Sequence, residues 1–460
     1  MSASNSGGHP ASTFSVGSTT SQPSLSEQVR RYKSKRFKEK QEHLSKKDTG
    51  GAGAYESLQM KCIKVLVANF EKSPTHDGRV ESKHLLEITS RLPIDLDPKQ
   101  SAVFVHDESY WKRACLDPNS TLTPSECQIV EHGMTWKQLF FEHHLRRRLE
   151  LFDDRGGQGG DAEDGKEEEK KTAEETVEDL LEEIEKYQDY IFGLSFKQLP
   201  SHLEVDRICE KLPNLTKMDI QYGINKIGME YDRRLFGMKI SDASCVAKAI
   251  KDSMNLTSVV LCGNLMDDDL LRMLMTGLYK SSTITHLDVS HNKITNHGVR
   301  LLAKLLGSKS VLTSLSVADN QIHAEGGRYL GRALRSNDSL SDLNIRLNRL
   351  TDEGGRMLLE GLRDNQSITK LNIGSNSLGT ESMTALSVVL REPASELLVL
   401  DMSSNHLSDD DIDVLYSTIQ RKSKLISLDL RMNSTSKENE TLERIADLLH
   451  TNELAFREGS

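Results

Sequence analysis

Residues 284–294 read ITHLDVSHNKI, and this stretch decides the fold of the chain. Its frame of apolar residues is Ile284-x-x-Leu287-x-Val289-x-x-Asn292-x-Ile294, and residues 340–350 repeat the frame as L-x-x-L-x-I-x-x-N-x-L. The asparagine returns in steps of 28, 28, 28, 28, 29 and 28 residues. It stands at Asn264, Asn292, Asn320, Asn348, Asn376, Asn405 and Asn433. Self-similarity at a fixed period indicates a repeat architecture.

This frame is the leucine-rich repeat signature, and each part of it has a physical meaning. The L-x-L step has period two, so its apolar side chains share one face of a short strand. Such a strand cannot bury a core alone, but copies stacked side by side form a parallel sheet with a continuous interior. The asparagine follows where the chain turns inward, and its amide can pair backbone groups that the turn leaves unpaired. We therefore interpret the seven asparagines as structural residues.

The second half of each repeat has helical spacing. After Ile294 comes the segment Thr295 to Gly298, which is typical of a helix start, and then Val299, Leu302 and Leu306 follow. A strand and a full helix in 28 residues predict an α/β solenoid of the ribonuclease-inhibitor-like class, a horseshoe with strands inside and helices outside. We expect at least seven parallel strands. They are centred near Val259, Leu287, Leu315, Leu343, Leu371, Leu400 and Leu428.

Both ends of the repeat array are predicted to be atypical, as terminal repeats usually are. Residues 177–255 should hold a capping helix, with apolar residues from Val177 to Ile191, and a degenerate first repeat around Met218. Gly223 takes the asparagine position of that repeat. Residues 256–460 should hold the clear repeats and a closing helix around Ile445.

The part before the repeats divides by composition. Residues 1–54 predict a disordered tail, and within it residues 28–47 form a basic arm. Residues 55–152 predict a small helical region that contains both tryptophans, which its own core or another subunit must cover. Residues 153–176 predict a flexible acidic linker, and residues 153–186 carry 15 acidic against 5 basic residues.

The basic arm has two interpretations that the sequence leaves open. It can bind a polyanion, such as nucleic acid, acidic lipid or the acidic tails of tubulin. It can also be a solvated helix, or a tail that folds on a partner.

The chain has six cysteines, none at C-x-x-C spacing and none in a zinc pattern. We find no signal peptide and no apolar run of membrane-spanning length, so we expect reduced thiols in a cytosolic compartment.

Motifs of catalytic chemistry are absent from the sequence, including the phosphate-binding, nucleophile-elbow and zinc-protease patterns. We therefore expect no enzyme, cofactor or metal site. Gly326, Gly327 and Gly331 are explained by close helix–strand packing. The runs 267–269 and 409–411 are each three aspartates; calcium is one interpretation, and charge at a helix N-terminus is the favoured one.

The concave face is where a binding role is expected, because residues that alternate with the core leucines point into the horseshoe. The candidates are His286, Asp288, Asp342, Asn344, Arg346, Lys370, Asn372, Asp401, Asp429 and Arg431. They include no aromatic residue and no basic stripe, which argues against nucleic acid. A protein partner with a polar, mixed-charge surface fits better, and an unused, solvated sheet is the alternative.

Three stretches outside the repeats carry a more specific resemblance. They are ESYWKR at residues 108–113, LEVDRIC at 203–209 and MEYDRRLFGM at 229–238. With the repeats, over roughly residues 55–450, they resemble the T-complex-associated testis-expressed family, which forms subunit 5 of the nexin–dynein regulatory complex. The resemblance implies a structural subunit of the axoneme of motile cilia and flagella, within the cytoskeleton. That complex links doublet microtubules and helps regulate dynein, and the arm at 28–47 would suit an acidic microtubule surface.

Two other protein classes share this repeat type. Ran-type GTPase-activating proteins often carry an acidic segment, but theirs follows the repeats and this one precedes them. Inhibitors or sensors of the ribonuclease-inhibitor type have cysteine-rich repeats, which this chain lacks.

Overall fold

The computed structural model describes residues 57–74, 80–117, 122, 134–151, 177–199, 203–223, 236–307, 310–393, 395–420, 424–436 and 439–459. The predictions of a tail at 1–54 with its basic arm and of an acidic linker at 153–176 lie outside these residues. The chain divides into two compact units, residues 1–65 and 66–460. The repeats and most of the helical region belong to the second unit.

Short helices precede the repeats, as the sequence predicts. They are α2 (Leu58–Ala68), α3 (Ser82–Arg91), α4 (Pro98–Phe104), α5 (Glu108–Cys115), α7 (Trp136–Leu151), α8 (Val177–Ile184) and the 3-10 turn η1 (Gln188–Tyr190). Trp111 is fully buried between Tyr110 and Phe141, with ring centroids 5.0 Å away in each case. Its indole N–H donates to the carbonyl of Val105 at 3.1 Å. The region's own core therefore covers this tryptophan.

The segment before the repeats differs from the expected capping helix. Helix α8 ends at Ile184, so Tyr187 and Ile191 lie beyond it, although both are fully buried. After η1 the chain forms an additional strand, β1 (Gly193–Leu199). The apolar spacing from residue 177 to 191 correctly predicted buried side chains. Its prediction of one continuous helix was wrong, because the backbone turns after Ile184 to start this strand.

The sheet contains nine strands among the described residues, and each pairs in parallel with its sequence neighbour. After β1 come β2 (Lys217–Tyr222), β3 (Ser258–Val260), β4 (His286–Asp288), β5 (Ser314–Ser316), β6 (Asp342–Asn344), β7 (Lys370–Asn372), β8 (Val399–Asp401) and β9 (Ser427–Asp429). The core leucines stand in register, with Leu287 opposite Leu315 and Leu343 opposite Leu371. The predicted parallel solenoid is confirmed.

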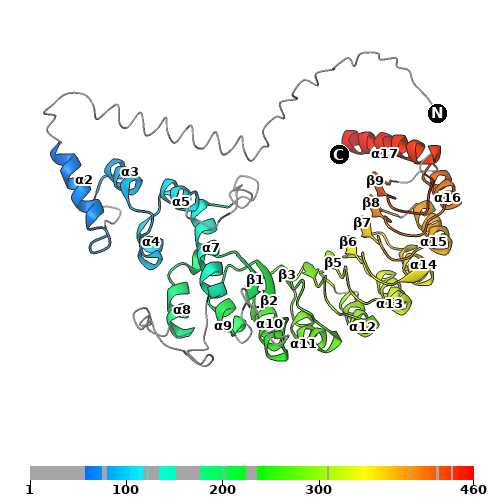
Figure 1. Cartoon of the computed structure of the whole chain (residues 1–460), viewed down its shortest axis with the longest axis horizontal. Helices are drawn as coiled ribbons and strands as arrows, with labels where there is room; N and C mark the ends of the chain where they lie inside the picture. Colours follow the sequence, from blue (N-terminus) through cyan, green and yellow to red (C-terminus); the bar gives the residue numbers. More distant parts are fainter. Residues whose placement is uncertain are drawn as a thin grey trace, which may run out of the picture. The chain divides into compact units, whose positions relative to one another are not determined.

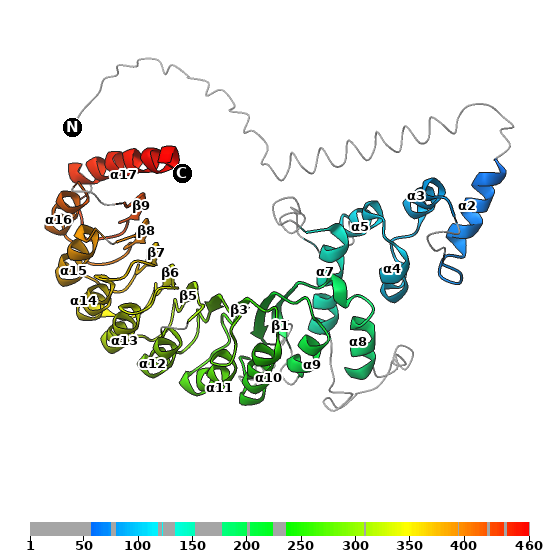
Figure 2. The same cartoon turned by 180° about the vertical axis from the view of Figure 1, so that it is seen from behind.

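Each strand from β3 onward is followed by a helix on the outer side of the repeat array, while the strands line the inner side (Figures 1 and 2). The repeat helices are α9 (Val205–Glu210), α10 (Ile240–Asp252), α11 (Asp268–Leu278), α12 (Asn296–Leu305), α13 (Ala324–Leu334), α14 (Thr351–Leu362), α15 (Thr380–Arg391), α16 (Asp409–Ile419) and α17 (Glu440–Gly459). Helix α17 closes the array and buries Ile445 and Leu449.

The repeat asparagines join neighbouring repeats. The amide nitrogen of Asn320 donates to Val317 in its own repeat and to Val289 in the repeat before, each at 3.1 Å. Its amide oxygen accepts the N–H of Ile294 at 3.0 Å. The side chain is 6% exposed. One amide thus pairs backbone groups on both sides of a repeat boundary, which fixes the turn and the stacking together.

A second ladder was not predicted from the sequence. At the residue before each strand from β2 to β7, a hydroxyl donates to a carbonyl of the preceding repeat. The hydroxyls belong to Thr216, Thr257, Thr285, Thr313, Ser341 and Thr369. Leu398 and Ile426 take this position in the last two strands, so the ladder ends at β7.

Gly327 and Gly331 of α13 correct one prediction, because they serve helix–helix contact and not helix–strand packing. A Cβ on Gly331 would lie 2.4 Å from the carbonyl oxygen of Met357, and one on Gly361 would lie 2.1 Å from that of Gly331. The backbones of α13 and α14 therefore touch, and a methyl group would force them apart. Gly326 is different, since its neighbours are the side chains of Ile322 and Asn296.

The two aspartate runs cap helices. Asp267 accepts the N–H groups of Asp269 and Leu270 at the start of α11. Asp268 accepts the N–H groups of Thr295 and Gly298 at the start of the next helix, at 2.9 and 3.0 Å. In the second run, Asp409 and Asp411 likewise accept backbone N–H groups, those of Ser436 and Ser408. Carboxylates at these positions complement the helix dipole.

Candidate functional site

The concave face is formed by the side chains that flank each buried core residue of the strands. In β3, β5, β6 and β8 the middle residue is buried and its two neighbours are partly exposed. The strand register places the candidate residues in rows across the sheet. The first row is formed by the first residue of each three-residue strand and contains His286, Asp342 and Lys370. The middle row is formed by the third residue of these strands and contains Asp288, Asn344, Asn372, Asp401 and Asp429.

The middle row has a structural role that the sequence reasoning missed. The side-chain oxygen of Asp288 accepts the N–H of Ser290, two residues on, at 2.9 Å. Asn344, Asn372, Asp401 and Asp429 make the same bond with the residue two positions later. Strands β4, β6, β7, β8 and β9 thus each end in a turn held by a side chain of the strand. The recurrence of Asp or Asn at this position was the sequence signal that could have revealed it.

Charged side chains form a connected cluster over the later strands. Arg346 Nη1 lies 3.4 Å from Asp401 Oδ2. Arg431 donates from Nε and Nη2 to both oxygens of Asp429, at 2.6 to 3.1 Å. These bonds hold the pKa of the Asp429 carboxyl below its usual range, and partial burial opposes the effect. Two aspartates and two arginines therefore lie near one another at the ends of β6, β8 and β9.

The first row contains charged side chains that form no ion pair with the described residues. Asp342 of β6 and Lys370 of β7 are register partners, yet within the described part of the chain neither forms an ion pair. His286 is exposed, and its Nδ1 bonds the hydroxyl of Thr285 at 2.8 Å. These three candidates have no structural task comparable to that of the middle row.

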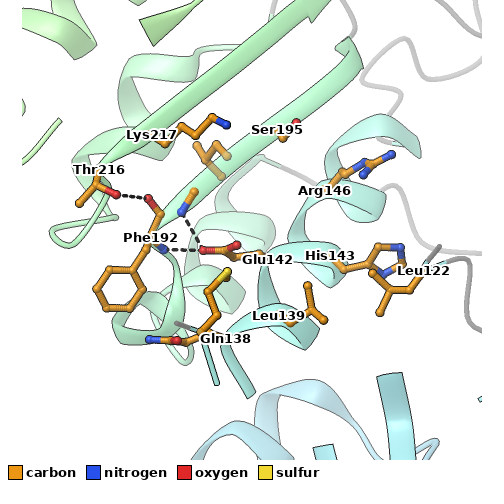
Figure 3. Close-up of a pocket in the computed structure, with 13 residues that line it drawn as sticks. Leu122, Gln138, Leu139, Glu142, His143, Arg146, Phe192, Ser195, Thr216 and Lys217 are labelled. Carbon is orange, nitrogen blue, oxygen red and sulfur yellow. Dashed lines mark hydrogen bonds between the residues drawn. The ribbon is translucent and has the colours of Figure 1, made fainter. Parts of the chain in front are cut away.

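A second candidate site lies where α7 meets the first strands (Figure 3). A cavity of about 640 Å³ is lined there by residues of α7, β1 and β2, and Glu142 is its central carboxylate. Glu142 Oε1 accepts the N–H groups of Phe192 at 2.9 Å and Gly193 at 2.7 Å. Burial raises the pKa of Glu142, and these two bonds oppose that shift. The carboxylate anchors the start of β1 to α7.

This contact was invisible in the sequence, since Glu142 lies 50 residues before Phe192. A neighbouring residue of α7 is equally unexpected. The Lys137 ammonium is buried, donates to the carbonyls of Ala102 (2.7 Å) and Val105 (3.0 Å), and lies 4.1 Å from the ring centroid of Tyr190. Burial lowers the pKa of Lys137 to about 8.

The stretches that carry the resemblance are structural where they are described. ESYWKR forms most of α5, where Arg113 donates to the carbonyls of Thr89 and Leu92. LEVDRIC leads into α9 and buries Val205 and Ile208. In the third stretch, residues 229–235 lie outside the described part of the chain.

In the described residues we find no group of three His, Cys, Asp or Glu side chains arranged to hold a metal. The helices described there are too short or too polar to cross a membrane.

Comparison with known proteins supports the repeat assignment. The family model described as "Leucine Rich repeat" matches residues 280–303, 308–331, 336–359 and 364–387. Among solved structures, an internalin of Listeria monocytogenes is 18% identical with a TM-score of 0.34, over 56% of this chain and 66% of that one. The actin-binding site 2 of leiomodin-1 is 13% identical with a TM-score of 0.27, over 48% of this chain and 92% of that one.

Curated relatives share one name, dynein regulatory complex subunit 5. The protein of Chlamydomonas reinhardtii is 36% identical over 213 residues, 46% of this chain and 48% of the relative. The proteins of Mus musculus and Homo sapiens are 29% and 28% identical over 262 residues, 52% of this chain and 48% of each relative. The chain spans about half the length of these relatives. It contains leucine-rich repeats and is similar, over about half its length, to subunit 5 of the dynein regulatory complex.

Proposed function

We propose that this chain is a non-enzymatic structural subunit of a dynein regulatory complex in the axoneme of cilia and flagella. In this role it binds partner subunits through its concave face and helps to regulate dynein-driven motility. The observation that carries the proposal is the similarity, over about half of this repeat-bearing chain, to proteins named for that complex.

The concave face suits protein binding because its charges are presented on a rigid frame. The asparagine and hydroxyl ladders tie each strand to the next, so the side chains above them need little ordering when a partner binds. Arg346, Asp401, Asp429 and Arg431 offer both charge signs within one cluster. Asp342 and Lys370 add two charges that form no ion pair with the described residues and can pair with a partner. Complementary charges of this kind favour specificity and orientation.

A structural role also agrees with the chemistry of the thiol on this face. Cys262 follows β3 on the concave side, and burial together with the carboxylate of Asp288 raises the pKa of its thiol to about 12. At neutral pH it is therefore protonated and a poor nucleophile. The same holds for Cys209, whose pKa burial also raises to about 12.

Localisation of a tagged full-length chain in a ciliated cell, followed by purification of its partners, tests the proposal. Co-purification with dynein regulatory complex subunits from axonemes is expected. A chain that stays outside the axoneme contradicts it. Addition of the purified chain to a Ran GTP hydrolysis assay tests the rival class, and accelerated hydrolysis would favour a GTPase activator over a structural subunit.

A further inference from the structure

The turns that follow β6 to β9 form an exposed edge of the sheet with an unusual composition. We use the name basic rim for Arg346, Leu347, Arg349, Arg431 and Met432, which lie at the carboxyl ends of β6 and β9. Neither the repeat frame nor the ladders require these five side chains.

Two apolar residues of the basic rim are exposed and have a backbone conformation that disfavours large side chains. Leu347 is 48% exposed and Met432 is 81% exposed. Both have left-handed backbones, with φ of 55° and 61°. The equivalent residues of the two intervening repeats are Ser375 and Ser404, with φ of 54° and 57°. Backbone hydrogen bonds between neighbouring repeats hold these residues in this conformation. The N–H of Leu347 donates to the carbonyl of Gly374, and that of Ser375 donates to the carbonyl of Ser403. A short polar residue or glycine suits such a position better than leucine or methionine.

The charge of the rim is of one sign. The four turns read RLNR at 346–349, GSNS at 374–377, SSNH at 403–406 and RMNS at 431–434, so they contain three arginines and no carboxylate. Arg349 is exposed and forms no ion pair with any described residue. Arg346 and Arg431 contact Asp401 and Asp429 of the middle row, which belong to the strands and not to the four turns. The outer surface of the rim is therefore basic, with an apolar residue at each end.

We infer that the basic rim binds an extended acidic segment of a partner protein through apolar side chains seated on Leu347 and Met432. This inference rests on the proposed binding role and names the edge and the chemistry of the partner. Three strand steps separate the two apolar residues, which is about 14 Å at ~4.8 Å per step. Side chains four residues apart in an extended chain are about 13 Å apart and point the same way. Carboxylates between them would face the three arginines, which is the charge complementarity that the rim requires.

The acidic segment of this chain is a less suitable occupant. Residues 153–176 have the required charge, but alanine is their only apolar residue type besides glycine. Such a segment could pair with the arginines and would leave Leu347 and Met432 uncovered.

Photo-crosslinking in ciliated cells tests the inference directly. Benzoylphenylalanine replaces Leu347 or Met432 in the full-length chain, and the captured peptides are sequenced by mass spectrometry. Control chains carry it at Val388 or Val414, which are 39% and 43% exposed on α15 and α16. We expect both rim positions to capture the same partner segment, rich in Asp and Glu, with apolar residues four apart. Capture of a basic or uncharged segment, of residues 153–176, or yields no higher than at the control positions overturns the inference.

Two substitutions then test the assigned residues with the captured segment as a synthetic peptide. Leu347→Ser combined with Met432→Ser should weaken binding of that peptide roughly tenfold, as removal of interface anchors does. Serine already occupies the same backbone at Ser375 and Ser404, so the melting temperature should not fall. Arg349→Glu should weaken binding similarly and make the remaining binding less sensitive to salt. Val388→Ser with Val414→Ser, and Arg335→Glu on the helical side, are the matched controls, and equal losses in the controls contradict the role of the rim.

The outcomes separate the inference from the proposed function. If the chain enters axonemes normally and both rim positions capture nothing specific, the rim inference is wrong and the structural role stands. If the chain stays out of axonemes but the rim captures an acidic segment from the soluble fraction, the axonemal role is wrong and the rim inference stands.

Discussion

Arg346, on the turn after β6, contacts Asp401 of β8 across the intervening strand, with 3.4 Å between Nη1 and Oδ2. Gly374, in the intervening repeat and two residues after β7, borders this contact, since a Cβ there would lie 3.2 Å from Asp401 Oδ1 and 3.1 Å from Ser403 Oγ. Three repeats thus combine to present one charged cluster, and the missing side chain of Gly374 leaves space beside the Asp401 carboxylate. This relationship guides the first prediction.

Arg346→Glu combined with Arg431→Glu should leave folding intact and weaken incorporation into the partner assembly. Both arginines are on the surface, and exposed ion pairs of this kind contribute little to stability. A partner that matches the present pattern would meet two reversed charges, which can cost several kcal/mol across an interface. Thermal melting and a pull-down from ciliary extract measure the two effects.

The control for this prediction is a chain that begins at Thr176 and lacks the preceding helices. If the double reversal recovers every partner and the truncated chain recovers none, docking belongs to the region at 55–152 and the concave-face proposal is wrong.

Asn320→Ala should lower the free energy of unfolding by roughly 1–3 kcal/mol, because buried backbone groups of two repeats lose their partner. Asn214→Ala is a suitable control, since its amide makes one long bond, 3.4 Å to Asp189. Chemical denaturation should separate the two variants. Equal midpoints for both variants and the wild type would show that the amide does not hold the repeats together.

Gly361→Ala should be strongly destabilising, by roughly 1–3 kcal/mol, because the added methyl group would overlap the backbone of Gly331 and push α14 away from α13. Gly307→Ala is the matched control, with its nearest contact a backbone oxygen at 3.5 Å. The intrinsic helix propensity of alanine favours the substitution at Gly361, so a decrease in stability can only come from the contact. A Gly361→Ala variant as stable as the wild type would contradict the close approach of the two helices.

Stability should rise with pH between about 8 and 10.5 through Lys137. Burial lowers the folded-state pKa of Lys137 to about 8 from 10.5, so within this window the unfolded chain binds the extra proton. Raising the pH therefore favours the folded state, by at most about 1.4 kcal/mol per pH unit. Lys137→Met should remove this dependence, and comparison of its denaturation curves with the wild type between pH 7 and 10 isolates it. Parallel pH profiles for the two proteins would refute a buried, titrating Lys137.

Part of the candidate site was predictable and part was not. The alternation around Leu343 and Leu371 was enough to place Asp342 and Lys370 on the concave face, because a strand has period two. The local sequence does not show that Asp401 meets Arg346, because that contact spans three stacked repeats. The recurring Asp or Asn of the middle row indicated hydrogen bonds from these side chains to the backbone two residues later, and these bonds were not predicted.

By itself, the sequence determined the solenoid, because the 28-residue period repeats the same strand, turn and helix. Stacking these units side by side is the arrangement that buries their leucines. It also determined the role of the asparagines, since their environment is local and repeated. The contacts between segments that are not equivalent positions of the repeats were decided only by the tertiary structure. Strand β1 has Leu194 and Phe196 at strand spacing but no repeat frame, and its start is fixed by Glu142 of α7. The glycine contact of α13 with α14 likewise depends on how closely two helices approach, a distance that no pattern along one chain encodes.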